Sequence, residues 1–199
     1  MIGHMTVIFG CMFSGKTEEL IRLIRRAQIA GRICLIFKPA IDNRYGAQKV
    51  SSHNGEALEA IAVSDAQGIL GQLTPNVRVV AIDEAQFFDP EIVDVCKILL
   101  DRNLDVLVAG LALDFRGEPF GQMPNLLAMA DKVVQLYAIC TYRHANGQIC
   151  GEPATRTQRI VGGVPADYSD PLVVIGAQET YEARCSKHHV VSGKPLPEF

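Results

Sequence analysis

The sequence predicts an α/β fold with a mainly parallel sheet, followed by a small second domain that contains cysteines. Strand-like and helix-like runs alternate as far as about Gln135, and beyond it cysteines, glycines and prolines replace any helical periodicity. Alternating strands and helices form parallel sheets that are covered on both faces. Since domains usually contain roughly 100–200 residues, the 199-residue chain has room for one such core and a small module. We expect the first domain over residues 1–136 and the second over 137–199.

The first domain begins with a strand, a loop, a helix and a second strand. A short apolar run predicts a strand over Thr6–Phe9, and apolar residues at helical spacing predict a helix over Glu18–Ile29 that Gly31 ends. A second strand is expected over Ile33–Phe37, and the polar stretch Asp42–Glu56 is expected to be a loop.

The remainder of the first domain continues the alternation. Its apolar runs predict three strands, and two helices are expected between them, the first capped by the hydroxyl of Ser64 and the second with Pro90 in its first turn. The expected order is a strand over Leu58–Val63, a helix over Ser64–Leu73, a strand over Val77–Ile82, a helix marked by Pro90 and by apolar residues from Ile92 to Leu100, and a strand over Val106–Ala109.

Composition and charge exclude several classes of protein. With 48% hydrophobic and 21% charged residues, the chain resembles an ordinary globular protein rather than a disordered one. Its 19 basic and 22 acidic residues argue against a long nucleic-acid track, so no nucleic-acid partner is expected. No apolar run approaches the ~18–20 residues of a membrane span, and the first residues lack the pattern of a signal peptide. We therefore expect no membrane partner and a cytoplasmic location.

A phosphate-binding loop lies between the first predicted strand and helix. Its glycines allow backbone N–H groups to face a phosphate, Lys16 adds charge toward the β- and γ-phosphates, and Thr17 offers a hydroxyl to Mg²⁺. This pattern predicts a site for a nucleoside triphosphate with Mg²⁺. Cys11 is interpreted as a small packing residue. The loop consists of Gly10, Cys11, Met12, Phe13, Ser14, Gly15, Lys16 and Thr17.

Two adjacent carboxylates, Asp83 and Glu84, end the strand expected over Val77–Ile82. In proteins with a phosphate loop this is the usual place of a metal-organising Asp, so Asp83 is expected to hold Mg²⁺ and Glu84 to accept a proton. The acceptor could serve water in an ATPase or helicase, or a substrate hydroxyl in a kinase. Residues 85–199 are too few to supply the second motor domain of a helicase.

Five segments, in order along nearly the whole chain, resemble the type II thymidine kinases. The resemblance implies a RecA-type domain, a zinc-binding lasso domain that closes over the nucleoside, and ATP-dependent phosphorylation of the thymidine 5′-hydroxyl to give dTMP. It also implies feedback inhibition by dTTP and a homotetramer. The segments are Gly10–Thr17, Asp83–Phe88, Asp114–Gly121, Thr155–Arg159 and Tyr181–Cys185.

The resemblance also assigns roles to individual residues. Glu84 matches the catalytic base, assisted by Lys16, and Phe115 matches the ring that stacks on the base. The nucleotide-binding set comprises Gly10, Cys11, Met12, Phe13, Ser14, Gly15, Lys16, Thr17, Arg44, Asp83, Glu84, Ala85 and Gln86. In the resemblance, the lasso runs from about Ile160 to Ile175, with Val173 and Ile175 at its closing strand. The substrate-binding set comprises Met12, Phe87, Leu111, Phe115, Phe120, Arg159, Val173, Val174, Ile175, Gly176 and Tyr181.

Alternative interpretations stay open for several of these residues. The apolar ones could be ordinary core packing, and Arg44 and Arg159, which match positions near the phosphates, could be exposed arginines. Arg116 is a candidate for stabilising charge in the transition state, and His53 is a candidate contact of the donor phosphates. The chain also departs from the family pattern, since Ala112 stands where relatives commonly carry Asp.

The predicted zinc site departs from the family pattern as well. Its second half, Cys185-Ser186-Lys187-His188, has the expected spacing, but residues 141–149 separate Cys140 from Cys150. We expect this insertion to form an outward loop with its turn at Asn146-Gly147. Four sulfur and imidazole ligands suit a structural Zn²⁺, whereas His144 and His189 are rival ligands and loss of the metal is a further alternative. The predicted ligands are Cys140, Cys150, Cys185 and His188.

A second class of function also accommodates the phosphate loop. The chain could be a nucleotide-dependent switch or nucleic-acid-binding module in which ATP hydrolysis drives a conformational change. The aromatic residues Phe115 and Tyr181 favour the kinase. An assay with and without thymidine separates the two interpretations.

Overall fold

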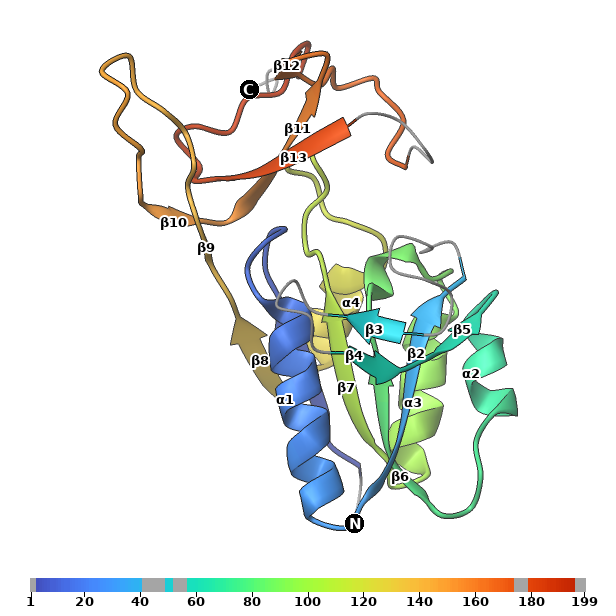
Figure 1. The fold of residues 1–199 in the computed structure, drawn as a ribbon. Coiled ribbons are helices and arrows are strands. Elements are labelled where there is room, and N and C mark those ends of the chain that lie inside the picture. The colour runs from blue at the N-terminus through green and yellow to red at the C-terminus, as the bar shows by residue number, and fades with distance from the viewer. Residues whose placement is uncertain (1–2, 41–48, 52–56, 174–178, 196–199) are drawn as a thin grey trace. The chain divides into compact units, whose positions relative to one another are not determined.

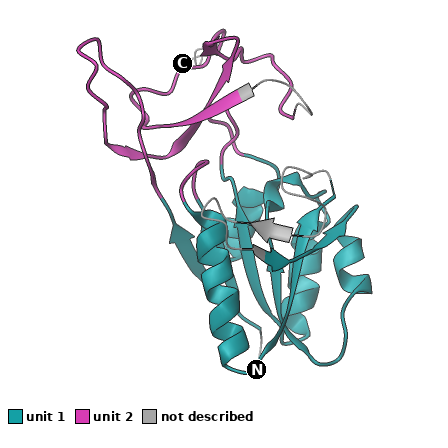
Figure 2. Ribbon diagram, in the orientation of Figure 1, with its two compact units in different colours: residues 1–9, 15–112, 120–136 teal, residues 10–14, 113–119, 137–199 magenta. Residues whose placement is uncertain are grey.

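The computed structural model describes residues 3–40, 49–51, 57–173 and 179–195, and these form two compact units (Figure 2). Unit 1 comprises residues 1–9, 15–112 and 120–136. Unit 2 comprises residues 10–14, 113–119 and 137–199. The phosphate-loop sequence therefore begins in unit 2 and ends in unit 1.

Unit 1 is built on a six-stranded sheet of order β5-β2-β6-β7-β1-β8 (Figure 1). Every pairing in it is parallel, as where Met5 to Phe9 of β1 lie beside Val106 to Gly110 of β7. The expectation of an α/β fold with a parallel sheet is confirmed. The strands are β1 Met5–Phe9, β2 Ile33–Pro39, β5 Ile61–Val63, β6 Val77–Ile82, β7 Asp105–Gly110 and β8 Lys132–Gln135.

Helices cover both faces of this sheet. Ile8, Ile36 and Ala81 face the buried side of α1, whereas their neighbours along the strands point to the opposite face. Successive side chains of a strand alternate between faces, so each buried strand contributes to two cores. The helices are α1 Lys16–Ile29 on one face, and α2 Gln67–Gly71, α3 Ile92–Asp101 and α4 Met123–Met129 on the other.

The strand expected over Leu58–Val63 is wrong in detail, because the structure has two strands there. β4 (Ala57–Glu59) pairs antiparallel with β3 (Lys49–Ser51), and β5 extends the parallel sheet beside β2. These residues form one mainly apolar segment in the sequence, but its two halves have different pairing partners. β3 also lies within Asp42–Glu56, which was expected to be a loop.

The predicted cap of the short helix is also wrong. Ser64 does not cap α2; its hydroxyl donates to Asp65, and the Asp65 carboxylate accepts the N–H of Gly68 (2.9 Å). The N–H of Ala66, one of those that a cap at Ser64 would bind, donates instead to the Asp89 carboxylate (2.8 Å). Pro90 precedes α3, which begins at Ile92.

Three further elements of unit 1 were not expected. α4 has seven residues, β8 has four and the 3-10 turn η1 (Ala85–Phe87) has three. Runs this short carry too few residues for a helical or strand period to emerge.

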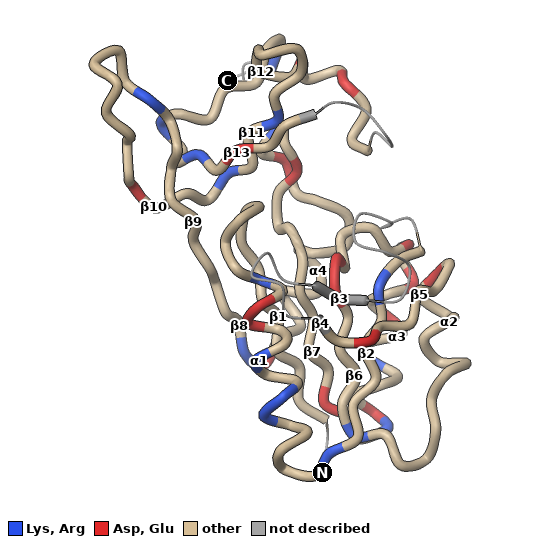
Figure 3. The backbone as a smooth tube through the Cα atoms, in the orientation of Figure 1, with Lys and Arg blue, Asp and Glu red and all other residues tan. Residues whose placement is uncertain are grey.

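Unit 2 consists of short antiparallel sheets and turns, with no helix among its described residues. β11 is the central strand of the three-stranded sheet; its charged positions are basic, whereas β13 carries both acidic and basic positions (Figure 3). Leu172 and Val173 of the strand-like run at 172–175 lie in no strand, and the rest of that run is outside the described residues. The strands are β9 Ala138–Ile139, β10 Pro153–Ala154, β11 Arg156–Val161, β12 Val164–Pro165 and β13 Glu179–Arg184.

In the part of the chain that the structure describes, no helix has the length and apolar character needed to cross a bilayer.

Candidate active site and metal cluster

Two residues of the predicted phosphate loop have a left-handed backbone. Gly15 precedes α1 in the left-handed region with φ 83°, and Phe13 is also left-handed with φ 66°. The Ser14 hydroxyl donates to the carbonyl of Cys11 (2.8 Å). Lys16 and Thr17 form the first turn of α1, and the N-terminus of a helix favours anions.

The first half of the loop is bonded within unit 2. The Cys11 thiol is buried and donates to the Ala154 carbonyl (3.3 Å), which supports a packing role. The backbone N–H of Met12 donates to the Thr157 hydroxyl (3.0 Å).

The acidic pair follows β6 in unit 1. Asp83 is buried, and its carboxylate lies 3.4 Å from the Thr17 hydroxyl, which donates to it. Its other oxygen accepts the N–H of Glu84 (3.0 Å). Glu84 itself has a left-handed backbone with φ 50°, which is uncommon for a residue with a side chain and is found at functional sites.

The side chain of Gln86 holds the Glu84 carboxylate. Its amide N–H₂ donates to Glu84, while its amide oxygen accepts the N–H of Leu111 (2.9 Å) just after β7. Gln86 is buried, and Gly121 lies so close that a Cβ there would be 2.3 Å from the Gln86 carbonyl oxygen. The resemblance gave Gln86 a nucleotide-binding role, and its contact with Glu84 was not foreseen.

Three of the apolar residues predicted to bind substrate lie in unit 1. The rings of Phe87 and Phe120 meet edge to face with centroids 5.4 Å apart. Leu111 and Phe120 are buried, and the Phe120 N–H donates to the carbonyl of Ala112 (3.0 Å). The backbone of Ala112 thus holds this segment, where relatives commonly carry an Asp side chain.

The loop that carries Phe115 belongs to unit 2 and is organised by Asp114. The buried Asp114 carboxylate accepts the N–H groups of Arg116 (2.8 Å) and Glu118 (3.0 Å), and it pairs with the Arg116 guanidinium (2.9 Å). Sequence analysis missed this role of Asp114. The signal was an Asp followed by Phe-Arg-Gly, which is typical of a turn in which the carboxylate binds its own backbone.

Arg159 is buried, with 2% of its surface exposed, so the alternative of an exposed arginine is wrong. Its guanidinium carbon lies 5.0 Å from the centroid of the Phe115 ring, and it donates to the carbonyl of Pro171. Tyr181 faces it on the neighbouring strand β13 and is partly buried. Val173 is exposed.

Five of the residues singled out in the sequence lie outside the described residues: Arg44, His53, Val174, Ile175 and Gly176.

The structure brings Cys140, Cys150, Cys185 and His188 together in unit 2. One ligand atom from each lies within 4.8 Å of the others. The Nδ1 atom of His188 is 3.4 Å from the Cys185 sulfur and 3.7 Å from the Cys140 sulfur. Three sulfurs and one imidazole are a donor set that suits tetrahedral Zn²⁺.

Insertion residues 141–149 form a hairpin whose turn at Asn146-Gly147 is confirmed, with Gly147 at φ 82°. Tyr142 of this hairpin stacks on the His188 ring with centroids 4.0 Å apart and an interplanar angle of 11°. His144 meets both rings edge-on. Neither His144 nor His189 belongs to the four-residue cluster.

The surroundings of the cluster favour a thiolate at Cys140. Burial raises the pKa of this thiol, but hydrogen bonds from the backbone of Cys185 and Tyr142, together with His188, outweigh that effect and lower the pKa to about 7. Since thiolates are the metal-binding form of cysteine, this environment suits a metal ligand.

Comparison with known proteins agrees with this geometry. The family model described as thymidine kinase matches residues 3–189. The thymidine kinase of Coprothermobacter proteolyticus is 53% identical over 99% of this chain and 96% of its own length. That of Deinococcus radiodurans is 52% identical over 96% of this chain and 92% of its own length. The chain belongs to the thymidine kinase family.

Proposed function

We propose that the chain transfers the γ-phosphoryl group of ATP to the 5′-hydroxyl of thymidine, giving dTMP and ADP. The observation that carries this proposal is the pair of carboxylates after β6. Asp83 is bonded to Thr17 at the start of α1, and Glu84 is held by Gln86. A kinase needs a group that binds the metal and phosphates and a separate group that receives the hydroxyl proton.

The phosphate loop and Lys16 are proposed to bind the ATP phosphates, with Arg44, Ala85 and Gln86 completing the nucleotide-binding set. Thr17 and Asp83 would hold Mg²⁺, because both present oxygen donors at the start of α1 and the end of β6. When bound, this ion would neutralise charge on the phosphates.

Glu84 is proposed as the general base. As the 5′-oxygen forms its bond to the γ-phosphorus and the bond from that phosphorus to the bridging oxygen of ADP breaks, the hydroxyl proton passes to the Glu84 carboxylate. Gln86 orients this carboxylate, since its amide is fixed in turn by the N–H of Leu111.

The thymidine contacts are proposed from the resemblance. Phe115 would stack on the base, and the lasso would bind it mainly through backbone groups. Arg159 would act near the phosphates. Its guanidinium also lies over the Phe115 ring, so it would help to hold that ring in place. The proposed set is Met12, Phe87, Leu111, Phe115, Phe120, Arg159, Val173, Val174, Ile175, Gly176 and Tyr181.

Zn²⁺ is proposed to be structural. All four positions of a tetrahedral site are supplied by the cysteines and histidine of the cluster, which leaves none for a substrate. Metal analysis of the purified chain should give one zinc per chain.

Feedback inhibition by dTTP, a homotetramer, a cytoplasmic location and the division into domains at 136/137 are further proposals that the resemblance supports. Inhibition kinetics with dTTP test the first of these, and light scattering of the purified protein tests the assembly state.

Glu84→Gln tests the proposed base. Because general-base catalysis contributes about 10²–10⁴-fold, kcat for thymidine phosphorylation should fall by that order while ATP binding, measured by calorimetry, stays unchanged. Glu91→Gln, a change at an exposed carboxylate outside the site, is the matched control. Unchanged turnover in Glu84→Gln contradicts the assignment. Nucleoside-independent, DNA-stimulated ATP hydrolysis by the wild-type chain contradicts the kinase.

A further inference from the structure

The backbone around His189 in unit 2 is fixed on both sides. On one side His188 belongs to the Cys₃His cluster. On the other side the buried side-chain amide of Gln158 binds both backbone groups of Val190, accepting its N–H (2.8 Å) and donating to its carbonyl (2.7 Å). The backbone position of His189 is therefore restrained through both of its neighbours, His188 and Val190.

The imidazole of His189 contacts the backbone of the loop that carries Phe115. Its Nε2 atom lies 2.8 Å from the Phe115 carbonyl oxygen, and because a carbonyl only accepts, Nε2 carries the proton and donates. The ring also lies beside Gly117, where a Cβ would be 3.5 Å from its Cε1 atom.

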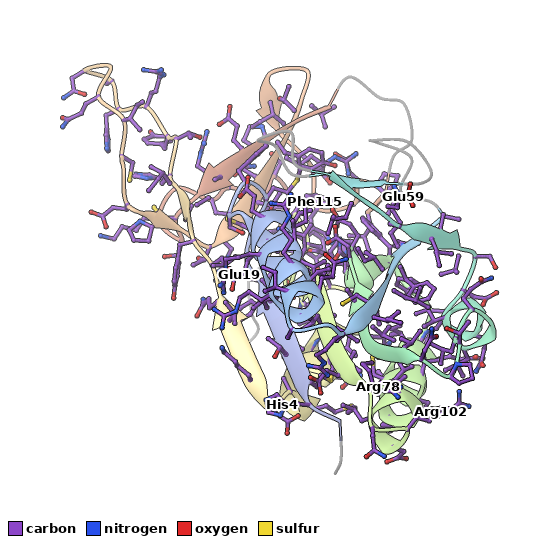
Figure 4. All side chains as sticks on the ribbon, turned by 60° about the horizontal axis from the view of Figure 1, so that its bottom comes forward. His4, Glu19, Glu59, Arg78, Arg102 and Phe115 are labelled. Carbon is purple, nitrogen blue, oxygen red and sulfur yellow. The ribbon has the colours of Figure 1, made fainter. Side chains whose placement is uncertain are left out.

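The same C-terminal segment contacts the loop a second time. Lys194 donates to the carbonyl of Arg116 (2.7 Å) and pairs with the Glu118 carboxylate (2.8 Å). The Phe115 ring, marked in Figure 4, is buried, and the Arg159 guanidinium lies over it. Backbone and ring of Phe115 are thus held by different elements of unit 2.

We propose that His189 is a positioning residue that fixes the backbone of Phe115, and through it the ring that stacks on the pyrimidine base. This inference rests on the proposed function. Because His189 directly follows the proposed zinc ligand His188, it would connect the Cys₃His cluster to nucleoside binding. His189 itself touches no reacting atom.

The test compares His189→Ala and His189→Gln in the zinc-loaded full chain. Loss of one neutral hydrogen bond should raise the KM for thymidine by roughly 3- to 10-fold, with kcat, the KM for ATP and the zinc content unchanged. The Gln amide N–H should restore most of the thymidine KM. His144→Ala, which alters another histidine beside the cluster, should leave the KM for thymidine unchanged.

Repeating His189→Ala in a Phe115→Leu background tests whether the effect passes through Phe115. If it does, His189→Ala should raise the KM for thymidine little further in the Phe115→Leu background. An unchanged KM for thymidine in His189→Ala overturns the inference, and so does an equal rise in the KM for both substrates or a loss of zinc in both His189 variants. A wild-type chain that fails to phosphorylate thymidine overturns the proposed function instead.

Discussion

The two units are stabilised by different means. The core of unit 1 lies on both faces of a parallel sheet and contains valine, isoleucine, leucine, phenylalanine and methionine side chains. The buried cluster of unit 2 contains six residues, all of them alanine or cysteine. Small side chains bury little apolar area, so we infer that unit 2 depends on side-chain hydrogen bonds and on the zinc proposed for its Cys₃His cluster. In unit 1, by contrast, residues such as Asp83 and Glu84 are held in position by the strands of the sheet that precede them.

Removal of the proposed zinc should produce the largest difference in behaviour between the two units. Because structural zinc sites contribute on the order of 10 kcal/mol to folding, a strong chelator should unfold the described part of 137–195 and leave the sheet of unit 1 intact. Hydrogen exchange should then show lost amide protection in β11 and β13 and retained protection in β1, β6 and β7. Equal loss of protection in both units would contradict the comparison.

Gly121→Ala should have the next largest effect, in unit 1. The new Cβ would lie 2.3 Å from the Gln86 carbonyl oxygen, at a residue with φ 53°. We expect a loss of about 2–5 kcal/mol in the free energy of unfolding of unit 1, measured by denaturant titration.

Gly31→Ala is the matched control for that substitution. Gly31 also has a positive φ of 74°, but no atom lies within 4 Å of the place that an added Cβ would take. It should lose only about 1 kcal/mol. Equal losses in the two variants would mean that backbone conformation alone, and not the approach to Gln86, sets the requirement for Gly121.

Tyr142→Leu should produce the smallest effect and should affect unit 2. The ring of Tyr142 stacks on His188, so its loss should weaken zinc binding by about 10-fold. The rate of zinc release to a chromogenic chelator measures this. Arg143→Ala in the same hairpin, where the side chain reaches only the Gly147 carbonyl in the described structure, should release zinc at the wild-type rate. Equal rates of zinc release from the wild type, Tyr142→Leu and Arg143→Ala would show that Tyr142 does not support zinc binding.

Local patterns were sufficient for four strands of the parallel sheet and for the loop before α1. The alternating apolar runs predicted β1, β2, β6 and β7, and the glycines and Lys16 predicted the loop before α1. These features depend on residues near one another in the chain. The strand over Leu58–Val63 and the cap at Ser64 were wrong because pairing with β3 and the hydrogen bond from the Ala66 N–H to Asp89 compete with the local signal.

The sequence by itself determined which functional groups this protein carries. They are a phosphate-loop sequence, two carboxylates after a buried strand, and enough cysteine and histidine for a metal site. Only the tertiary structure decided how these groups are held. It selected His188 from three candidate histidines, bonded Gln86 to Glu84 and buried Arg159 beside Phe115. Such contacts join residues from different elements, and their geometry follows from how the chain packs rather than from any local pattern.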